Sequence, residues 1–255
     1  MISQYYSVLA AGKFNPSQVR VIYDSDLYSV TRDVDQQQAI KKCWEEARLN
    51  SKRNGRLLFS SEIFRLADAA VDGEILSLYF GNTDYKDYYA TRLASDIGSM
   101  ASNPLGSVVI PLTCDGYIPL ARRSMTVDAN PGKYFTFGGF FDRSLDWDEV
   151  GQPDIFGFIY RELQEEMGDL KVNNLYIKGV IYDCILPHPE IIAIAELSDS
   201  KEEMKSKNMT SDEFENVQFI HVSDIYNFVE KNHPQICNTT IGALSLFAED
   251  CLDNA

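Results

Sequence analysis

An acidic cluster lies between residues 160 and 170, where the sequence YRELQEEMGDL carries four carboxylates and one arginine. On an α-helix, Glu162, Glu165 and Glu166 share one face, because residues three and four positions apart are neighbours. Like charges at this spacing repel each other, whereas a divalent cation offsets the repulsion. Carboxylate oxygens are the ligands that Mg²⁺ or Mn²⁺ prefers. The spacing therefore predicts a metal site on this helix.

Two residues beside the cluster support a helix that presents it. Arg161 precedes Glu165 by four positions, so the two side chains can form an ion pair. Gly168 suits the left-handed residue at which many helices end, which places the cluster where the helix dipole disfavours anions. A solvated helix face with several ion pairs is the alternative, and it is typical of charged helices.

The sequence PGKYFTFGGFFD, residues 131–142, favours the metal site over that alternative. Its paired glycines permit a backbone turn that brings a carbonyl oxygen close to a metal ion. Together with the acidic helix, this stretch resembles the Nudix box, G-x5-E-x7-R-E-U-x-E-E-x-G-U, in which U is apolar. The matching residues are Gly139, Arg161, Glu162, Leu163, Glu165, Glu166 and Gly168.

The sequence departs from the box in the loop between its two halves. Gly139 precedes Arg161 by 22 positions, eight more than the box allows. The box's first glutamate has no counterpart, since its spacing before the arginine falls on Pro153. Three nearby carboxylates are candidates to replace it, and the third is equally suited to an N-cap. They are Asp148, Glu149 and Asp154.

The resemblance extends to the sequences at residues 78–93, 101–112 and 118–139 and to the elongated box loop, which are similar to the Nudix UDP-glucose and UDP-galactose diphosphatases. It implies Mg²⁺-dependent hydrolysis, with Mn²⁺ as an alternative, of a UDP-sugar to UMP and a sugar 1-phosphate. Two other activities stay open: hydrolysis of ADP-ribose or another nucleoside diphosphate derivative, and nucleotide binding without hydrolysis. Box residues handle the pyrophosphate and not its two ends, so they do not separate the substrates.

The resemblance also implies roles for individual residues. The metal ligands that it implies are Glu162, Glu165, Glu166 and the carbonyl of Gly139. Arg161 joins these glutamates in the catalytic set. In this family a general base often comes from outside the box, and Glu190 matches in position, although a charge at the exposed edge of a strand is an equal alternative.

Candidates for substrate binding lie on both sides of residue 103. Arg122 and Arg123 end a predicted strand and can grip a phosphate in a bidentate manner. Tyr85 and Lys86 can contribute to uridine or phosphate binding, although a tyrosine-rich helix also suits core packing. His188, between two prolines, is either a substrate contact or an incidental loop residue.

Hydrophobic periodicity and turn signals indicate the elements that must position these residues. Residues 1–103 are predicted to form an N-terminal α+β extension, with a strand at 18–26, a helix at 35–55, a hairpin at 62–71 and 74–80, and a helix at 83–98. Residues 104–255 are predicted to form the Nudix domain, an α/β/α sandwich with a mixed sheet. Its predicted strands are 107–112, 117–123, 134–137, 176–186, 190–197 and 216–222, followed by helices at 223–231 and 239–252.

Composition limits the partners. The 38 acidic and 23 basic residues give a net charge of −15, which disfavours nucleic acid and anionic membranes and means that an anionic substrate needs local attraction. The five cysteines include no CxxC pair, which favours a reducing compartment. No window reaches the roughly 18 apolar residues of a membrane helix. We therefore expect a cytoplasmic protein with a small-molecule substrate, and the sequence leaves its oligomeric state open.

Overall fold

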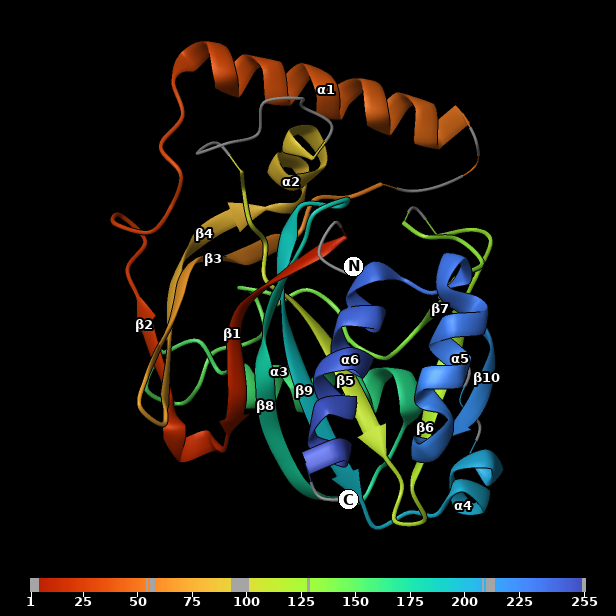
Figure 1. Cartoon of the computed structure of the whole chain (residues 1–255). Coiled ribbons are helices and arrows are strands. Elements are labelled where there is room, and N and C mark those ends of the chain that lie inside the picture. Colours follow the sequence, from red (N-terminus) through yellow and green to blue (C-terminus); the bar gives the residue numbers. More distant parts are fainter. Residues whose placement is uncertain are drawn as a thin grey trace.

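A computed structural model describes residues 5–53, 55, 58–92, 101–127, 129–207, 209 and 214–253, without the side chains of 250–253. Its strands form three sheets, and helices lie on both sides of the central one (Figure 1). Within the described residues, none of the helices combines the length and the apolar character needed to cross a bilayer. The described cysteine side chains are free thiols: Cys43, Cys114, Cys184 and Cys237.

The central sheet is mixed and has four strands. In spatial order they are β1 (Tyr6–Phe14), β8 (Val172–Asp183), β9 (His188–Leu197) and β5 (Gly106–Leu112). β8 pairs antiparallel with both β1 and β9, whereas β5 runs parallel to β9. This parallel pairing places the first residue of β5, Gly106, beside Glu190 of β9.

Two three-stranded sheets flank the central one. One contains β10 (Phe214–His221), β6 (Tyr117–Arg123) and β7 (Tyr134–Phe135), all antiparallel. The other contains β2 (Val19–Tyr23), β4 (Ile75–Asp84) and β3 (Glu62–Asp72). β3 and β4 form the predicted hairpin, and Gly73 in its turn has a φ of 58°, which glycine adopts without steric cost.

Alternating side chains of the central sheet pack into two hydrophobic cores, one on each face. In β9, Ile191, Ala193 and Ala195 contact the core that includes α3 (Ile155–Met167). The intervening Ile192 and Ile194 contact a second core, which includes residues of α5 (Ile225–Asn232) and α6 (Asn238–Asp253). Because both faces of a strand are buried, its sequence is apolar throughout rather than alternating. The predicted α/β/α layering is confirmed.

The remaining helices are shorter or lie in the N-terminal half. They are α1 (Val34–Arg53), α2 (Tyr85–Thr91) and α4 (Lys201–Ser206), with 3₁₀ turns at Pro16–Gln18, Val222–Asp224 and His233–Gln235. α1 is confirmed as predicted, and its Trp44 packs edge-on against Tyr85 and Tyr89 of α2. Part of the predicted helix at 83–98 lies outside the described residues.

Contacts cross the predicted boundary at residue 103 in several places. β1 belongs to the central sheet, and Phe64 of β3 packs against Phe141 with ring centroids 4.4 Å apart. The buried core around α3 likewise contains residues of β3 and β4. The division into an extension and a Nudix domain remains a proposal, and the two parts share one core.

Candidate functional site

Helix α3 carries the acidic cluster between two well-defined ends. Asp154 is its N-cap, and its side chain accepts a hydrogen bond of 2.9 Å from the amide of Gly157. Gly168 ends the helix with a φ of 74°, in the left-handed region. The N-cap interpretation of Asp154 and the predicted helix end at Gly168 are both confirmed.

Arg161 joins α3 to the loop that precedes it. Its Nε and Nη2 donate to the two carboxylate oxygens of buried Asp146 at 2.8 and 2.7 Å. The same carboxylate accepts the Asp142 amide at 2.8 Å, so it also fixes the loop. Asp146, which the sequence reasoning did not name, is thus the partner of Arg161 in this loop. Of the three carboxylates that the sequence suggested, Asp148 instead accepts two amides of its own turn, from Val150 and Gln152.

The three glutamates of α3 turn to different partners. Glu166 is buried, and its Oε2 accepts the Gly138 amide at 2.7 Å. Glu165 is exposed and lies 3.2 Å from Arg161 Nη1, which also contacts Glu162 Oε1 at 2.8 Å. Their predicted convergence is not seen: among the described residues no group of three or more His, Cys, Asp or Glu side chains is arranged to hold a metal ion. Glu162 and Glu165 instead share the Arg161 guanidinium, and Glu166 accepts a backbone amide.

Glu162 lies directly against the glycine turn. A Cβ atom on Gly139 would come within 2.3 Å of Glu162 Oε2, so this approach requires glycine. The Gly139 carbonyl accepts the Ser107 amide at 2.9 Å, which leaves its second lone pair for another partner. Burial raises the pKa of Glu162 to about 7, although the neighbouring Arg161 guanidinium lowers it. A partly buried carboxylate beside a glycine turn with an available carbonyl lone pair is a donor set that fits Mg²⁺.

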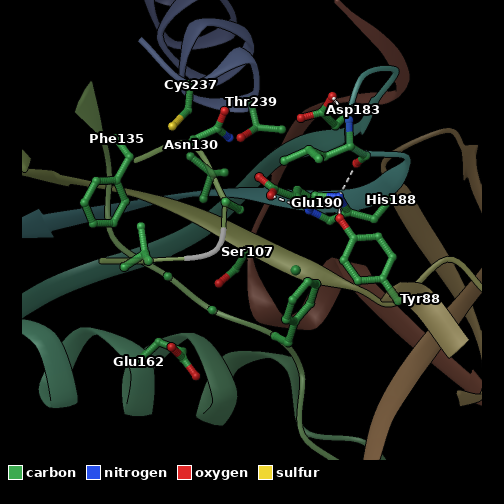
Figure 2. Close-up of a pocket in the computed structure, with 18 of the residues that line it drawn as sticks. Tyr88, Ser107, Asn130, Phe135, Glu162, Asp183, His188, Glu190, Cys237 and Thr239 are labelled. Atoms are coloured by element: carbon green, nitrogen blue, oxygen red, sulfur yellow. Dashed lines mark hydrogen bonds and ion pairs between the residues drawn. The ribbon is translucent and has the colours of Figure 1, made fainter. Parts of the chain in front are cut away.

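A cavity of about 650 Å³ opens beside Glu162 (Figure 2). Its walls come from α3, from β5 and β9, from the loop before β7 and from the start of α6. The N-terminal half also contributes, through Phe59, Ser61, Ile63, Tyr85, Tyr88 and Arg92. A cavity of this size holds a ligand of nucleotide dimensions and is lined by both halves of the chain.

Glu190 projects into this cavity from the start of β9. Its side chain is only 13% exposed, so the alternative of a surface charge at a strand edge is wrong. Glu190 Oε1 lies 2.7 Å from His188 Nε2. Within the described part of the chain, Oε2 is buried and has no hydrogen-bond partner. A buried carboxylate oxygen without a donor is costly unless a ligand or water completes it.

His188 connects Glu190 to the N-terminal half. Its Nδ1 contacts the Leu186 carbonyl and lies 3.2 Å from the Tyr88 hydroxyl. Burial alone would lower the pKa of His188, but the hydrogen bond to Glu190 outweighs it, and the pKa is raised. Burial also raises the pKa of Tyr88, so its hydroxyl stays protonated. Sequence reasoning did not identify Tyr88 and left His188 open; the pairing of residues 100 positions apart gave no local signal.

The four candidate substrate-binding residues divide into two pairs. Arg123 and Tyr85 line the cavity. Arg122 and Lys86 do not line it. Arg122 Nε donates to the Gly132 carbonyl at 3.1 Å, and Lys86 Nζ contacts Asp84 at 2.5 Å. For each pair of adjacent residues, the backbone directs only one side chain into the cavity.

Comparison of the sequence with family models and with curated proteins finds no match. Among solved structures, similar chains include an ADP compounds hydrolase with 17% identity and a TM-score of 0.42, over 60% of this chain and 75% of that chain. Tm1382, provisionally described as a Nudix hydrolase, has 14% identity and a TM-score of 0.40, over 60% and 72%. The MutT protein from Methanosarcina mazei Go1 has 16% identity and a TM-score of 0.38, over 49% and 81%. At these TM-scores the activity must be argued from the site residues.

Proposed function

We propose that this chain is a Nudix-type hydrolase that cleaves the pyrophosphate of a nucleoside diphosphate sugar, with UDP-glucose or UDP-galactose giving UMP and a sugar 1-phosphate. One observation supports it most: the box glutamate Glu162 lies against Gly139 at the wall of a nucleotide-sized cavity, which also holds the unpartnered oxygen of Glu190. The uridine preference rests on the sequence similarity at residues 78–93, 101–112 and 118–139 and in the elongated box loop alone.

The proposed metal ligands are Glu162 and the carbonyl of Gly139. Glu165 and Glu166 would join them by giving up their contacts with Arg161 and with the Gly138 amide. When bound, Mg²⁺ supplies charge neutralisation for the pyrophosphate oxygens. Arg161 holds Glu162 in place from one side, and Asp146 holds Arg161 from the other. The proposed metal-binding carboxylate of Glu162 is therefore positioned by two consecutive ion pairs, Asp146–Arg161 and Arg161–Glu162.

Glu190 is the proposed general base. Its free Oε2 removes a proton from the attacking water, the water oxygen bonds to phosphorus, and the bridging P–O bond breaks with its electrons on the leaving phosphate. His188 restrains Oε1, so that the second oxygen keeps its orientation. Both groups come from β9, which β5 and β8 hold rigidly on either side.

A nucleotide-binding module without hydrolysis is the second candidate. Two of the three box glutamates already contact other groups, since Glu165 pairs with Arg161 and Glu166 accepts the Gly138 amide. This leaves Glu162 beside Gly139 as the box carboxylate for a metal ion, which favours binding without hydrolysis. A third candidate keeps the hydrolysis and takes ADP-ribose or another nucleoside diphosphate derivative as substrate.

The test is a panel of UDP-glucose, UDP-galactose, ADP-ribose and ADP-glucose incubated with the protein and Mg²⁺, with products resolved by chromatography. Cleavage of the UDP-sugars to UMP and sugar 1-phosphate, with at least about tenfold lower kcat/KM for the adenine compounds, supports the proposal. Nucleotide binding in a thermal-shift assay with no products supports the module. Preferred cleavage of an adenine compound keeps the hydrolase and rejects the uridine preference.

A further inference from the structure

We propose that the amino-terminal end of α6 and Arg123 form an anion subsite, which takes phosphate oxygens of the substrate at the end of the cavity opposite Glu162. The inference rests on the proposed function in taking the ligand to be a phosphate compound. Figure 2 shows Cys237 and Thr239 at the start of α6 on one side of the cavity and Glu162 of α3 on the other.

The start of α6 presents backbone donors to the cavity. The first hydrogen bond inside the helix runs from the Ile241 amide to the Cys237 carbonyl at 3.0 Å. The amides of residues 238–240 therefore have no acceptor within the helix. The Cys237 amide donates to the Tyr134 carbonyl at 2.9 Å, which fixes this helix end beside β7. Cys237, Thr239 and Thr240 all line the cavity.

Two buried donors beside this helix end lack a partner within the described residues. Thr136 is 3% exposed and lines the cavity; its amide donates to Thr240 Oγ1 at 3.3 Å, but its own hydroxyl has no hydrogen bond. Arg123 also lines the cavity, and its Nε is buried without a partner. The Arg123 guanidinium lies 4.7 Å from the centroid of the Phe135 ring. A ring face attracts a cation but accepts no conventional hydrogen bond, so the donors of this guanidinium suit an anion.

Both signs of charge line the cavity, and Arg123 supplies a cation whose charge acts on Cys237. Carboxylates lining the cavity are Asp142, Glu162, Glu165, Asp183 and Glu190, and its lining cations are Arg92 and Arg123. Arg92 lies over the rings of Tyr88 and Tyr89, on the side that belongs to α2. Burial raises the pKa of the Cys237 thiol to about 12; the charges of Arg123 and Lys133 lower this pKa, and those of Glu190 and Asp183 raise it.

The amino-terminal end of α6 and Arg123 thus line the same cavity. Helix amino-termini bind phosphate through free amides and the dipole, and an arginine adds charge-assisted hydrogen bonds. In a protein with a net charge of −15, this local positive potential is what an incoming phosphate requires. A phosphate compound spanning the cavity would then meet α6 at one end and Glu162 at the other.

The test is calorimetric titration of the full chain with inorganic phosphate and with UMP, in EDTA and at low ionic strength. Thr239→Asp places a carboxylate in the subsite, where it repels an anion. We expect at least about a tenfold rise in Kd for both ligands. Arg123→Gln should raise both Kd values by a similar factor.

Arg122→Gln is the matched control, since the adjacent side chain on β6 does not line the cavity. It should leave Kd for phosphate within about twofold of the parent. No phosphate binding by the parent chain, or unchanged binding by Thr239→Asp, would overturn the subsite. These titrations use neither metal nor turnover, so their result can be interpreted even if the hydrolase assay shows no activity. The hydrolase assay can likewise be interpreted if phosphate does not bind at the subsite.

Discussion

The two walls of the cavity each offer a partly buried carboxylate, but they pair it with different partners. On α3, Glu162 is paired with Arg161, a permanent cation that is itself fixed by Asp146. On β9, Glu190 is paired with His188, whose charge depends on pH, and keeps one oxygen free. A fixed cation holds a ligand in place, whereas a titratable partner allows a proton to move. The first wall therefore suits metal binding and the second suits proton transfer.

Replacing each of the two carboxylates separately with an amide should give the largest effects. Glu162→Gln should abolish measurable Mg²⁺ binding and lower kcat/KM by about a thousandfold or more. Glu190→Gln should lower kcat by about 100- to 10,000-fold while the Kd for Mg²⁺ stays the same. Calorimetry with Mg²⁺ and steady-state kinetics with UDP-glucose measure the two quantities.

Glu196→Gln is the matched control on the same strand, since Glu196 does not line the cavity and its carboxylate contacts Asn174. It should behave as the parent in both assays. Equal loss of Mg²⁺ affinity in Glu190→Gln and Glu162→Gln would contradict the division of roles between the walls.

The raised pKa of Glu162 predicts how metal binding depends on pH. Since a carboxylate must lose its proton to bind Mg²⁺, affinity should rise about tenfold per pH unit below pH 7 and level off above it. In the metal-free protein the sign for stability is opposite. The protonated form is favoured by folding, so its contribution is full below about pH 4.5 and is lost as pH rises to about 7. Thermal unfolding of metal-free Glu162→Gln should lack this loss of Tm between about pH 4.5 and 7. If the variant's Tm changes with pH as the parent's does, the loss belongs to other groups.

On the β9 wall, His188→Gln tests the titratable partner. The folded-state pKa of His188 is raised, so its ion pair with Glu190 adds stability below about pH 6.5 that is lost as pH rises through the raised value. The variant's Tm should lie about 5 °C below that of the parent at pH 6, with a smaller deficit at pH 9. Thermal unfolding at the two pH values measures this, and a deficit that does not change with pH would indicate packing alone.

The smallest effects are expected in α2. Tyr88→Phe removes the hydroxyl that contacts His188 and should lower kcat about threefold. Lys86→Ala should change KM by less than about twofold, because Lys86 contacts Asp84 and does not line the cavity. A KM increase above fivefold for Lys86→Ala would restore the sequence-based assignment of this lysine to substrate binding.

The outcome for neighbouring residues shows what sequence reasoning could supply. Adjacent residues of a strand point to opposite sides of the sheet, so only one of Arg122 and Arg123 can face the site. Which of the two does so depends on how β6 pairs in the sheet, and the sequence does not show this. The helical spacing correctly placed the three glutamates on one turn of α3. It could not predict their donors, since the Gly138 amide that holds Glu166 comes from a distant turn.

The loop insertion explains the missed partner of Arg161. Counting back from the arginine leads to Pro153, whereas counting forward from Gly139 leads to the position before Asp146. The extra residues form a turn after Asp146, in which the Asp148 amide bonds to the Gln152 carbonyl at 2.8 Å. The forward count came closer to Asp146, because the extra turn follows this residue instead of preceding it.

The pairing of β1 with β8 has a consequence for synthesis of the chain. Tyr6 lies opposite Asp183 and Phe14 opposite Ile177, so β1 is completed by a strand that is made much later. Roughly 160 residues separate them, which a ribosome adds in about 8–30 s at roughly 5–20 residues per second. During that interval the apolar side of β1 has no neighbouring strand, and a chaperone that recognises extended apolar segments would meet it before the sheet does. An amino-terminal tag or fusion partner would then act on folding yield more strongly than one at the other end.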